Sequence, residues 1–391
     1  MPISTKIRGF IENASWIRRM FEKAIELKVQ HGADSVLDFT LGNPTLEPPQ
    51  AFVDRLRDLA ANPPPGLHRY MPNAGFPAVR EAVAEALGRQ TGVALRGEHV
   101  LMTVGAAGAL NVALKALLDP GDEVIVLAPY FVEYLFYIDN HGGTARVVET
   151  DHAFLPDVEA IGRAIGPQTK AIILNSPNNP TGVVYPRALL ERLAAGLGAA
   201  AGRVGHPIYV LSDEPYRKIR YVDEVTSALS VFQDCVMCTS HSKDLSLPGE
   251  RIGLAAVHPE AHDGHELLGA MTFAIRTLGF VNAPAILQLA VAGLQDLAID
   301  VEPYRRRRDL LYRGLVDAGY ECVLPGGAFY LFPRSPIPDD VEFVRRLLRE
   351  LVLVVPGSGF GRGGHFRLSY CVDLEVIERA LPALRRAREG L

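Results

Sequence analysis

The chain has 391 residues, of which 48% are hydrophobic and 22% are charged, a balance typical of a folded globular protein rather than a disordered one. The formal net charge is −5, so the sequence offers no basic field for nucleic acid, and no run of about 18 apolar residues predicts a membrane span. The start of the chain contains charges and no apolar h-region, and the four cysteines are scattered, so we expect a cytoplasmic enzyme.

The N-terminal part of the chain is predicted to form three helices separated by polar loops. An amphipathic pattern over residues 14–31 ends before Gly32, and a second pattern over residues 50–61 ends at the breaker "NPPPG". A third helix is expected in "GFPAVREAVAEALGRQTG", where Pro77 stands in the first turn and Gly92 lies just past the end.

Short apolar runs then alternate with helical patterns. The runs are "HVLMTVG", "EVIVLAP", "TARVVET", "KAIILNSP", "PIYVLSDEP" and "CVMCTSHSK", and this alternation predicts βαβ units and a largely parallel sheet. A long helical region is expected over residues 283–318, with a break at Pro303. The tail has the pattern of an α+β module, so we predict the main domain boundary near residue 285.

Polar and small residues follow the ends of four of these predicted strands, where ligands bind in open parallel sheets. "GAAGAL" is a small-residue turn that would let helix N–H groups approach a phosphate. "NNPTG" supplies an amide, "SDEPY" a carboxylate and a tyrosine, and "SHSKDLSLPGERIG" a lysine, hydroxyls and an arginine. Pyridoxal phosphate (PLP) needs a lysine for its Schiff base, an acid for its ring nitrogen and an anion site for its phosphate. The strand ends therefore predict a PLP site.

These motifs, in this order and spacing, resemble those of the fold-type I, class I and II aminotransferases of the aspartate aminotransferase superfamily. The resemblance runs from "LGNP" to "HFRLSY". It implies an α/β fold with a large domain, built on a mainly parallel seven-stranded sheet between helices, and a smaller α+β domain. It also implies transfer of an amino group between an L-amino acid and a 2-oxo acid by a ping-pong mechanism through a Schiff base on Lys243. The expected ranges are 1–45 for an N-terminal arm with part of the small domain, 46–285 for the large PLP-binding domain and 286–391 for the small domain.

The resemblance also implies roles for individual residues. Lys243 would be the Schiff-base lysine, and Asp213 would keep the cofactor's ring nitrogen protonated. Tyr216 and Asn179 would hydrogen-bond the phenolic oxygen of the ring. The expected contacts to the phosphate and the ring face come from the backbone amides of Ala106 and Ala107, from Ser240 and Arg251, and from the stacked ring of Phe131.

Three further residues are expected at the substrate and at the subunit interface. Arg367 matches the arginine that binds the α-carboxylate of the substrate, and Gly42, together with Asn179, would face the same end of the substrate. Tyr70 resembles a tyrosine that reaches the phosphate of the neighbouring subunit. This last match implies a homodimer with active sites at the interface.

Two alternatives stay open. A PLP-dependent C–S β-lyase would use Lys243 and Arg367 in the same ways, and Tyr130 could replace Phe131 as the stacked ring if the register is off by one. The amino donor is also open. Arg69, Arg276 and Arg362 are possible partners of an acidic side chain, while His68 and Tyr70 could line a pocket for a neutral or aromatic one.

Three motifs suggest other chemistry and are rejected. "GFGRGG" at 359–364 fits G-x-G-x-x-G, but a strand pattern rather than a helix follows it. "CVMC" at 235–238 lies inside a strand pattern, so we expect buried thiols. "HPEAHDGH" at 258–265 is expected to be a solvated loop, and no metal site is predicted.

Overall fold

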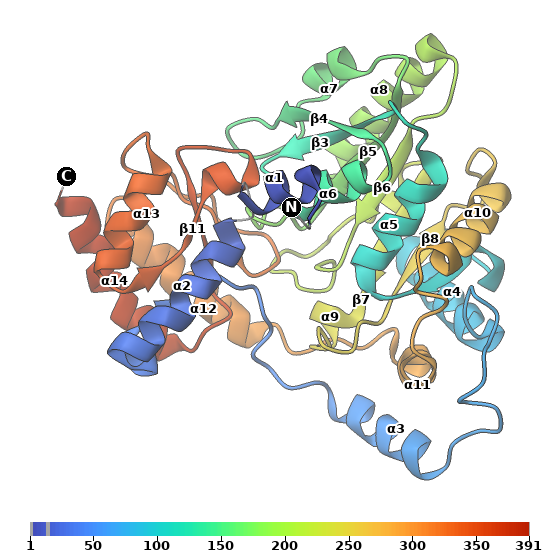
Figure 1. Ribbon diagram of the computed structural model, residues 1–391, viewed down its shortest axis with the longest axis horizontal. Coiled ribbons are helices and arrows are strands. Elements are labelled where there is room, and N and C mark those ends of the chain that lie inside the picture. The colour runs from blue at the N-terminus through green and yellow to red at the C-terminus, as the bar shows by residue number, and fades with distance from the viewer. Residues whose placement is uncertain (1–2, 13–15, 391) are drawn as a thin grey trace.

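The computed structural model describes residues 3–12 and 16–390 of the chain. Figure 1 shows a large sheet flanked by helices on the right and a smaller module of helices and short strands on the left. Among the described residues, no helix is both long and apolar enough to cross a membrane. The predicted α/β fold is confirmed.

The large sheet has seven strands, and six of them were predicted. Their order across the sheet is β2 (Val100–Thr103), β8 (Gly253–Val257), β7 (Cys235–Ser240), β6 (Tyr209–Asp213), β5 (Thr169–Asn175), β3 (Glu123–Ala128) and β4 (Thr144–Glu149). Strand β8 was not predicted, and it runs antiparallel to both β2 and β7, while the other pairs are parallel. The strands β7 and β8 form an antiparallel pair. Their connection, which carries Lys243 and Arg251, therefore lies at the end of β7 and the start of β8.

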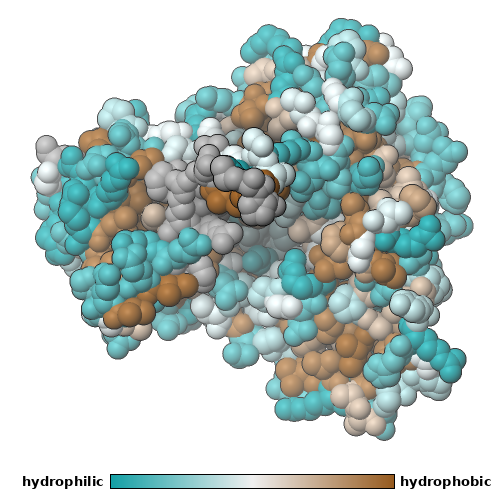
Figure 2. All heavy atoms as spheres, in the orientation of Figure 1, coloured by the Kyte–Doolittle hydropathy of each residue, from teal (hydrophilic) through white to brown (hydrophobic). Residues whose placement is uncertain are grey.

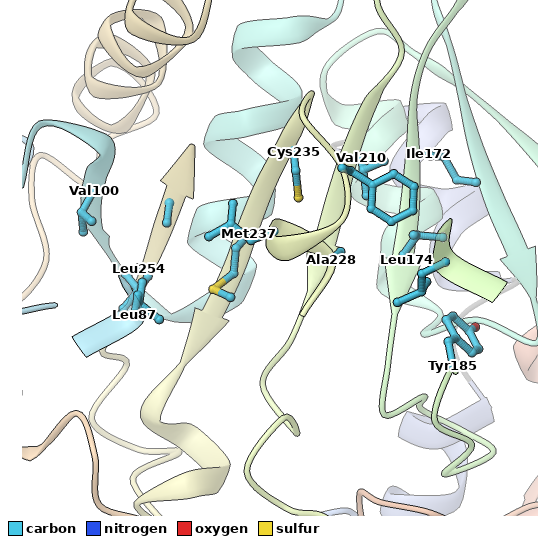
Figure 3. Close-up of a cluster of buried hydrophobic side chains, with 14 of the residues drawn as sticks. Leu87, Val100, Ile172, Leu174, Tyr185, Val210, Ala228, Cys235, Met237 and Leu254 are labelled. Carbon is cyan, nitrogen blue, oxygen red and sulfur yellow. The ribbon is translucent and has the colours of Figure 1, made fainter. Parts of the chain in front are cut away.

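Apart from the exposed edge strand β4, the sheet is buried on both faces, which explains why the other strands are apolar without alternation. Cys235 and Met237 belong to one hydrophobic cluster, and Val236 and Cys238 belong to another, because successive side chains point to opposite faces. Figure 3 shows Cys235 and Met237 together with Val210 and other residues of the first cluster. Both cysteines are buried free thiols, as the sequence predicted.

Helices surround this sheet, and two of them begin or end at the predicted breakers. Helix α3 ends before "NPPPG", and α4 has Pro77 in its first turn and ends at Gly92, whose φ is 76°. The helices of this part are α3 (Gln50–Ala61), α4 (Pro77–Thr91), α5 (Gly105–Leu117), α6 (Glu133–Asn140), α7 (Val158–Ala164), α8 (Arg187–Val204), α9 (His241–Asp244), α10 (Gly264–Thr277) and α11 (Ala285–Val291).

A third hydrophobic cluster defines the small module. In it, β1 (Leu37–Asp38) pairs in parallel with β10 (Val352–Leu353), so a segment that precedes the large sheet in the sequence belongs to the small module. The remaining elements are β9 (Tyr330–Leu331), β11 (Val355–Pro356) and β12 (Phe366–Ser369) in one sheet, and helices α2 (Trp16–His31), α12 (Glu302–Asp317), α13 (Asp340–Arg349) and α14 (Leu374–Glu389). Helix α1 (Thr5–Glu12) instead contacts α6, since the rings of Phe10 and Phe136 lie 4.9 Å apart.

The expected long helix over 283–318 is interrupted, but not at Pro303. Helix α11 ends at Val291, and α12 begins at Glu302 with Pro303 in its first turn, where a missing N–H costs nothing. Leu287 and Val291 pack in the cluster of the large sheet, just past the predicted boundary at residue 285. The division into domains stays a prediction. The "GFGRGG" motif overlaps a 3₁₀ turn and precedes strand β12, so the reason for rejecting a dinucleotide site is confirmed.

Candidate active site

Lys243 lies in the short helix α9, directly after β7. Its Nζ donates a hydrogen bond to the carbonyl oxygen of Gly42 at 2.9 Å and lies 5.9 Å from the centre of the Tyr216 ring. Burial lowers the pKa of Lys243 to about 8, and the positive charges of Arg251 and Arg367 act in the same direction. An amine with this pKa is neutral far more often than a surface lysine, and only a neutral amine is a nucleophile.

Asp213 lies at the end of β6 and is only 6% exposed. Its Oδ2 accepts a hydrogen bond from the hydroxyl of Tyr134, whereas its Oδ1 has no hydrogen-bond partner among the described residues. Burial raises the pKa of this carboxyl to about 7. A buried oxygen without a partner, on an acid whose ionised form is disfavoured, suits a cationic N–H group of a ligand.

The N-terminus of α5 has a geometry suited to an anion. Gly105, the first residue of this helix, has φ 71°, and a Cβ on it would lie 2.7 Å from Nη2 of Arg251. The guanidinium group therefore lies against the turn whose next residues are Ala106 and Ala107. Ser240 is the last residue of β7 and is 5% exposed. Free N–H groups at a helix N-terminus together with an arginine bind phosphate well.

Tyr216 and Asn179 lie at the junction of the large sheet and the small module. The hydroxyl of Tyr216 is 2.9 Å from that of Tyr330 on β9. Oδ1 of Asn179 accepts a hydrogen bond of 3.0 Å from Nη1 of Arg367, and the backbone N–H of Asn179 donates to Asn175 at 2.7 Å. These contacts connect the "NNPTG" and "SDEPY" segments to the C-terminal module.

Arg367 is held at the same junction from strand β12 and is only 2% exposed. Its Nη2 donates to the carbonyl oxygen of Thr40, its Nε has no partner among the described residues, and its Cζ lies 4.7 Å from the ring centres of both Tyr330 and Phe360. A Cβ on Gly42 would collide with the hydroxyl group of Tyr330. Thr40, Gly42, Tyr330 and Arg367 therefore converge beside Lys243.

The expected aromatic residues have different surroundings. The ring of Phe131 lies 5.6 Å from that of Tyr134, the partner of Asp213. Tyr130 instead contacts the small module, since a Cβ on Gly361 would lie 2.5 Å from its ring. Tyr70 is 93% exposed, so its side chain is free to contact another molecule.

The sequence analysis missed several residues of the site. Tyr134 and Tyr330 lie within apolar segments, where a tyrosine more often serves the core, and nothing local distinguishes them. His241, in the same motif as Lys243, is buried and lies 3.3 Å from Asp244. Asp244 also pairs with Lys218 at 3.1 Å, and Gln295 contacts the far side of the imidazole at 3.2 Å. This polar network holds α9 in place, and therefore also positions Lys243.

The three arginines considered for an acidic substrate have other contacts. Arg362 pairs with Glu149, and Arg276 lies 5.1 Å over the ring of Phe273. The Cδ of Arg69 lies beside Gly66. No hydrogen bond or ion pair within the described residues joins any of the three to Arg367 or Lys243.

Comparison with known proteins gives a consistent result. A family profile described as "Aminotransferase class I and II" matches residues 34–384. An aspartate/prephenate aminotransferase of Thermus thermophilus is 39% identical over 377 residues, covering 93% of both chains, and an aspartate aminotransferase of Thermotoga maritima is 36% identical over 360 residues, covering 90% and 91%. Among solved structures, an amino transferase from Eubacterium rectale has a TM-score of 0.96 at 36% identity, covering 100% and 99% of the two chains. The aspartate aminotransferase of Thermus thermophilus with maleate has a TM-score of 0.88 at 35% identity, covering 99% and 100%.

Proposed function

The chain belongs to the class I and II aminotransferases, and on that premise we propose that it transfers the amino group of L-aspartate to a 2-oxo acid. It is a PLP-dependent aminotransferase, as its family and its relatives are. The β-lyase alternative is not favoured, because close relatives carry the names of aminotransferases. Aspartate as the donor rests on the names of those relatives.

Three features of the chain fit pyridoxal phosphate. The buried Oδ1 of Asp213, which has no partner within the described part of the chain, can face a protonated ring nitrogen. The turn at Gly105, against the guanidinium group of Arg251, can hold a phosphate. Lys243 has an amine whose pKa is lowered to about 8, as a Schiff-base lysine requires. The observation that carries the proposal is this lysine in contact with Gly42, close to a buried Arg367.

We assign the residues that would hold the cofactor from these positions. When bound, pyridoxal phosphate would supply an electron sink for the bond that breaks at the substrate Cα, and Lys243 would be the residue that holds it covalently. The residues proposed to bind it are Arg251, Ser240 and the amides of Ala106 and Ala107 at the phosphate, Phe131 on the ring face, Asp213 at the ring nitrogen, and Tyr216 with Asn179 at the phenolic oxygen.

Different residues of the chain bind the substrate and move its proton. The guanidinium group of Arg367 binds the α-carboxylate, and the backbone of Gly42 faces the same end. Nζ of Lys243 removes a proton from Cα as a general base and delivers it again as a general acid, a task for which a pKa near the working pH is best. Tyr330 orients Tyr216 through the 2.9 Å contact between their hydroxyl groups. Two such half-reactions, one with an amino acid and one with a 2-oxo acid, make a ping-pong cycle.

A panel of amino donors tests this proposal. Purified holoenzyme is given 2-oxoglutarate with L-aspartate, L-phenylalanine or L-alanine, and formation of the 2-oxo acid of each donor is measured. We expect the highest kcat/KM with aspartate. A higher kcat/KM with phenylalanine or alanine would contradict the choice of donor but not the aminotransferase activity. Release of pyruvate from β-chloroalanine without any acceptor, at a rate above transamination, would favour a lyase.

We further propose a homodimer in which Tyr70 reaches the phosphate site of the partner subunit. The 93% exposure of Tyr70 supports this, and Figure 2 shows brown, hydrophobic residues gathered on the lower part of the surface around α3. Tyr70→Ala and Lys243→Ala subunits are each expected to be nearly inactive. Unfolding and refolding them together should restore activity, because a mixed dimer would contain one intact site. No recovery in such mixed dimers would mean that Tyr70 does not act across the interface.

A cytoplasmic location stays a prediction from the sequence.

A further inference from the structure

A cleft of about 1010 Å³, apart from the candidate active site, lies at the boundary between the large sheet and the small module. Lys243, Asp213, Arg251 and Arg367 are not among its lining residues. One wall comes from the segment after β4, and the other walls come from the small module. The residues used below are His152 and Phe154 on the first wall and Arg334, Ser335, Arg362 and Arg388 on the others.

The cleft is positively charged, although the whole chain has a net charge of −5. Three arginines line it, against one acidic residue, Glu321. Arg334 lies 3.2 Å from Glu321, but both side chains are largely exposed, so solvent weakens this ion pair. The second arginine, Arg362, pairs with Glu149 of β4, which lies outside the lining.

The third arginine, Arg388, has no ion pair or hydrogen bond among the described residues. It is partly buried near the end of α14, and its guanidinium group lies against Gly319, where a Cβ would be 2.7 Å from Cζ. A guanidinium group held in one place without an anion is a binding group that has lost little freedom before its ligand arrives.

A hydroxyl group without a partner lies in the same lining. Ser335 is 6% exposed, and its Oγ makes no hydrogen bond within the described residues. Buried polar groups almost always have partners, so an unpaired one beside a cationic cleft points to a ligand that accepts its proton. Behind it, the ring of His365 stacks on that of Phe332, with centres 5.2 Å apart and planes 2° apart, which gives the cleft a firm wall.

We propose that this cleft binds a small multivalent oxyanion, a compound that carries a phosphate or at least two carboxylates. Arginine forks match both groups, and three arginines in one cleft exceed what a single carboxylate needs. The ligand differs from the substrate, because the cleft does not include Arg367 or Lys243. It contacts both parts of the chain, so it acts as a bridge between the segment after β4 and the small module.

Calorimetric titration of the holoenzyme tests this site, with pyrophosphate and citrate as the two probes. In the holoenzyme the cofactor already fills the phosphate site at α5, and its absorbance shows that it stays bound. We expect one site per chain, with an affinity that falls as salt rises. Tighter binding of pyrophosphate would identify the phosphate class, and tighter binding of citrate the carboxylate class.

Variants then locate the binding. Arg388→Gln should weaken it roughly 10- to 100-fold, the loss expected for one charge-assisted pair. Ser335→Ala should weaken it several-fold without lowering the melting temperature, because Oγ has no partner to lose within the described residues. The matched control is Arg385→Gln, which removes the same charge from an exposed position one turn earlier on α14 and should change the affinity less than twofold.

Three results would overturn the proposal. One is no binding of either probe at 10 mM. Another is equal weakening by Arg388→Gln and Arg385→Gln, which would mean a diffuse charge effect. The last is binding that Arg367→Met abolishes while Arg388→Gln leaves it unchanged, because the probe would then occupy the substrate site. None of these outcomes bears on the aminotransferase activity itself.

Discussion

Replacing Asp213 by asparagine should change how the stability of the cofactor-free protein depends on pH. Burial raises the pKa of Asp213 from its ordinary value of 3.8 to about 7. Between these two values the folded protein holds a proton that the unfolded chain has lost, so folding becomes less favourable as the pH rises. Asparagine has the same shape but no such ionisation.

The size of the effect follows from the two pKa values. Relative to a pH below 3.8, the buried carboxyl costs about 2 kcal/mol at pH 5 and about 4 kcal/mol at pH 8. The amide has a cost of its own, because its NH₂ group is buried without an assigned acceptor, but that cost does not depend on pH. The difference in unfolding free energy between variant and wild type should therefore shift by about 2 to 3 kcal/mol in favour of the variant between pH 5 and pH 8.

Urea unfolding of both cofactor-free proteins at pH 5, 6, 7 and 8, followed by circular dichroism, measures this shift. Asp54→Asn, at an exposed position on α3, is the control and should show no pH-dependent difference. A variant that tracks the wild type at every pH would refute the reasoning, because Asp213 would then be ionised at no cost in the folded protein. With cofactor present the order should reverse, since Asp213 gains a cationic partner and the variant loses one.

Three further predictions concern the active site. Lys243→Ala should remove the absorbance of the Schiff base between the lysine and the cofactor, together with nearly all turnover, and leave the circular dichroism spectrum unchanged, whereas Lys115→Ala, at an exposed position, should keep both; an active Lys243→Ala enzyme would contradict the assignment. Tyr330→Phe leaves the buried hydroxyl of Tyr216 without its 2.9 Å partner, so kcat/KM should fall about three- to tenfold in steady-state assays, and an unchanged value would remove Tyr330 from the site. Arg367→Lys keeps the charge but loses the fork that reaches Asn179 at 3.0 Å; the donor KM should rise about 10- to 100-fold, more than kcat falls, and an unchanged KM would mean that the α-carboxylate binds elsewhere.

Much of the fold was predictable because its signals are local. Helices α3 and α4 begin and end at prolines and glycines that the sequence displays, and six strands are apolar runs bounded by polar turns. Strand β8 was missed because "GLAAV" directly follows a motif rich in polar residues. Five apolar residues also contain no local signal that the strand pairs in an antiparallel direction. Pro303 was misplaced as a helix breaker because the same residue is equally suited to a first turn.

The contacts within the site could not be predicted in this way, because they join residues that lie far apart in the sequence. The hydroxyl of Tyr134 meets Asp213 across 79 residues, Tyr216 meets Tyr330 across 114, and Arg367 meets Asn179 across 188. By itself, the sequence determined the residue types at the strand ends, the order of the motifs, the family that they resemble and the candidate nucleophile. Only the tertiary structure decided which tyrosines touch Asp213 and Tyr216, that the network of His241 anchors α9, and that Arg388, which has no ion pair within the described residues, lines a cleft apart from the candidate active site. The physical reason is that side-chain pairing depends on distance in space, and a chain brings such distant residues together only when its sheets and helices pack.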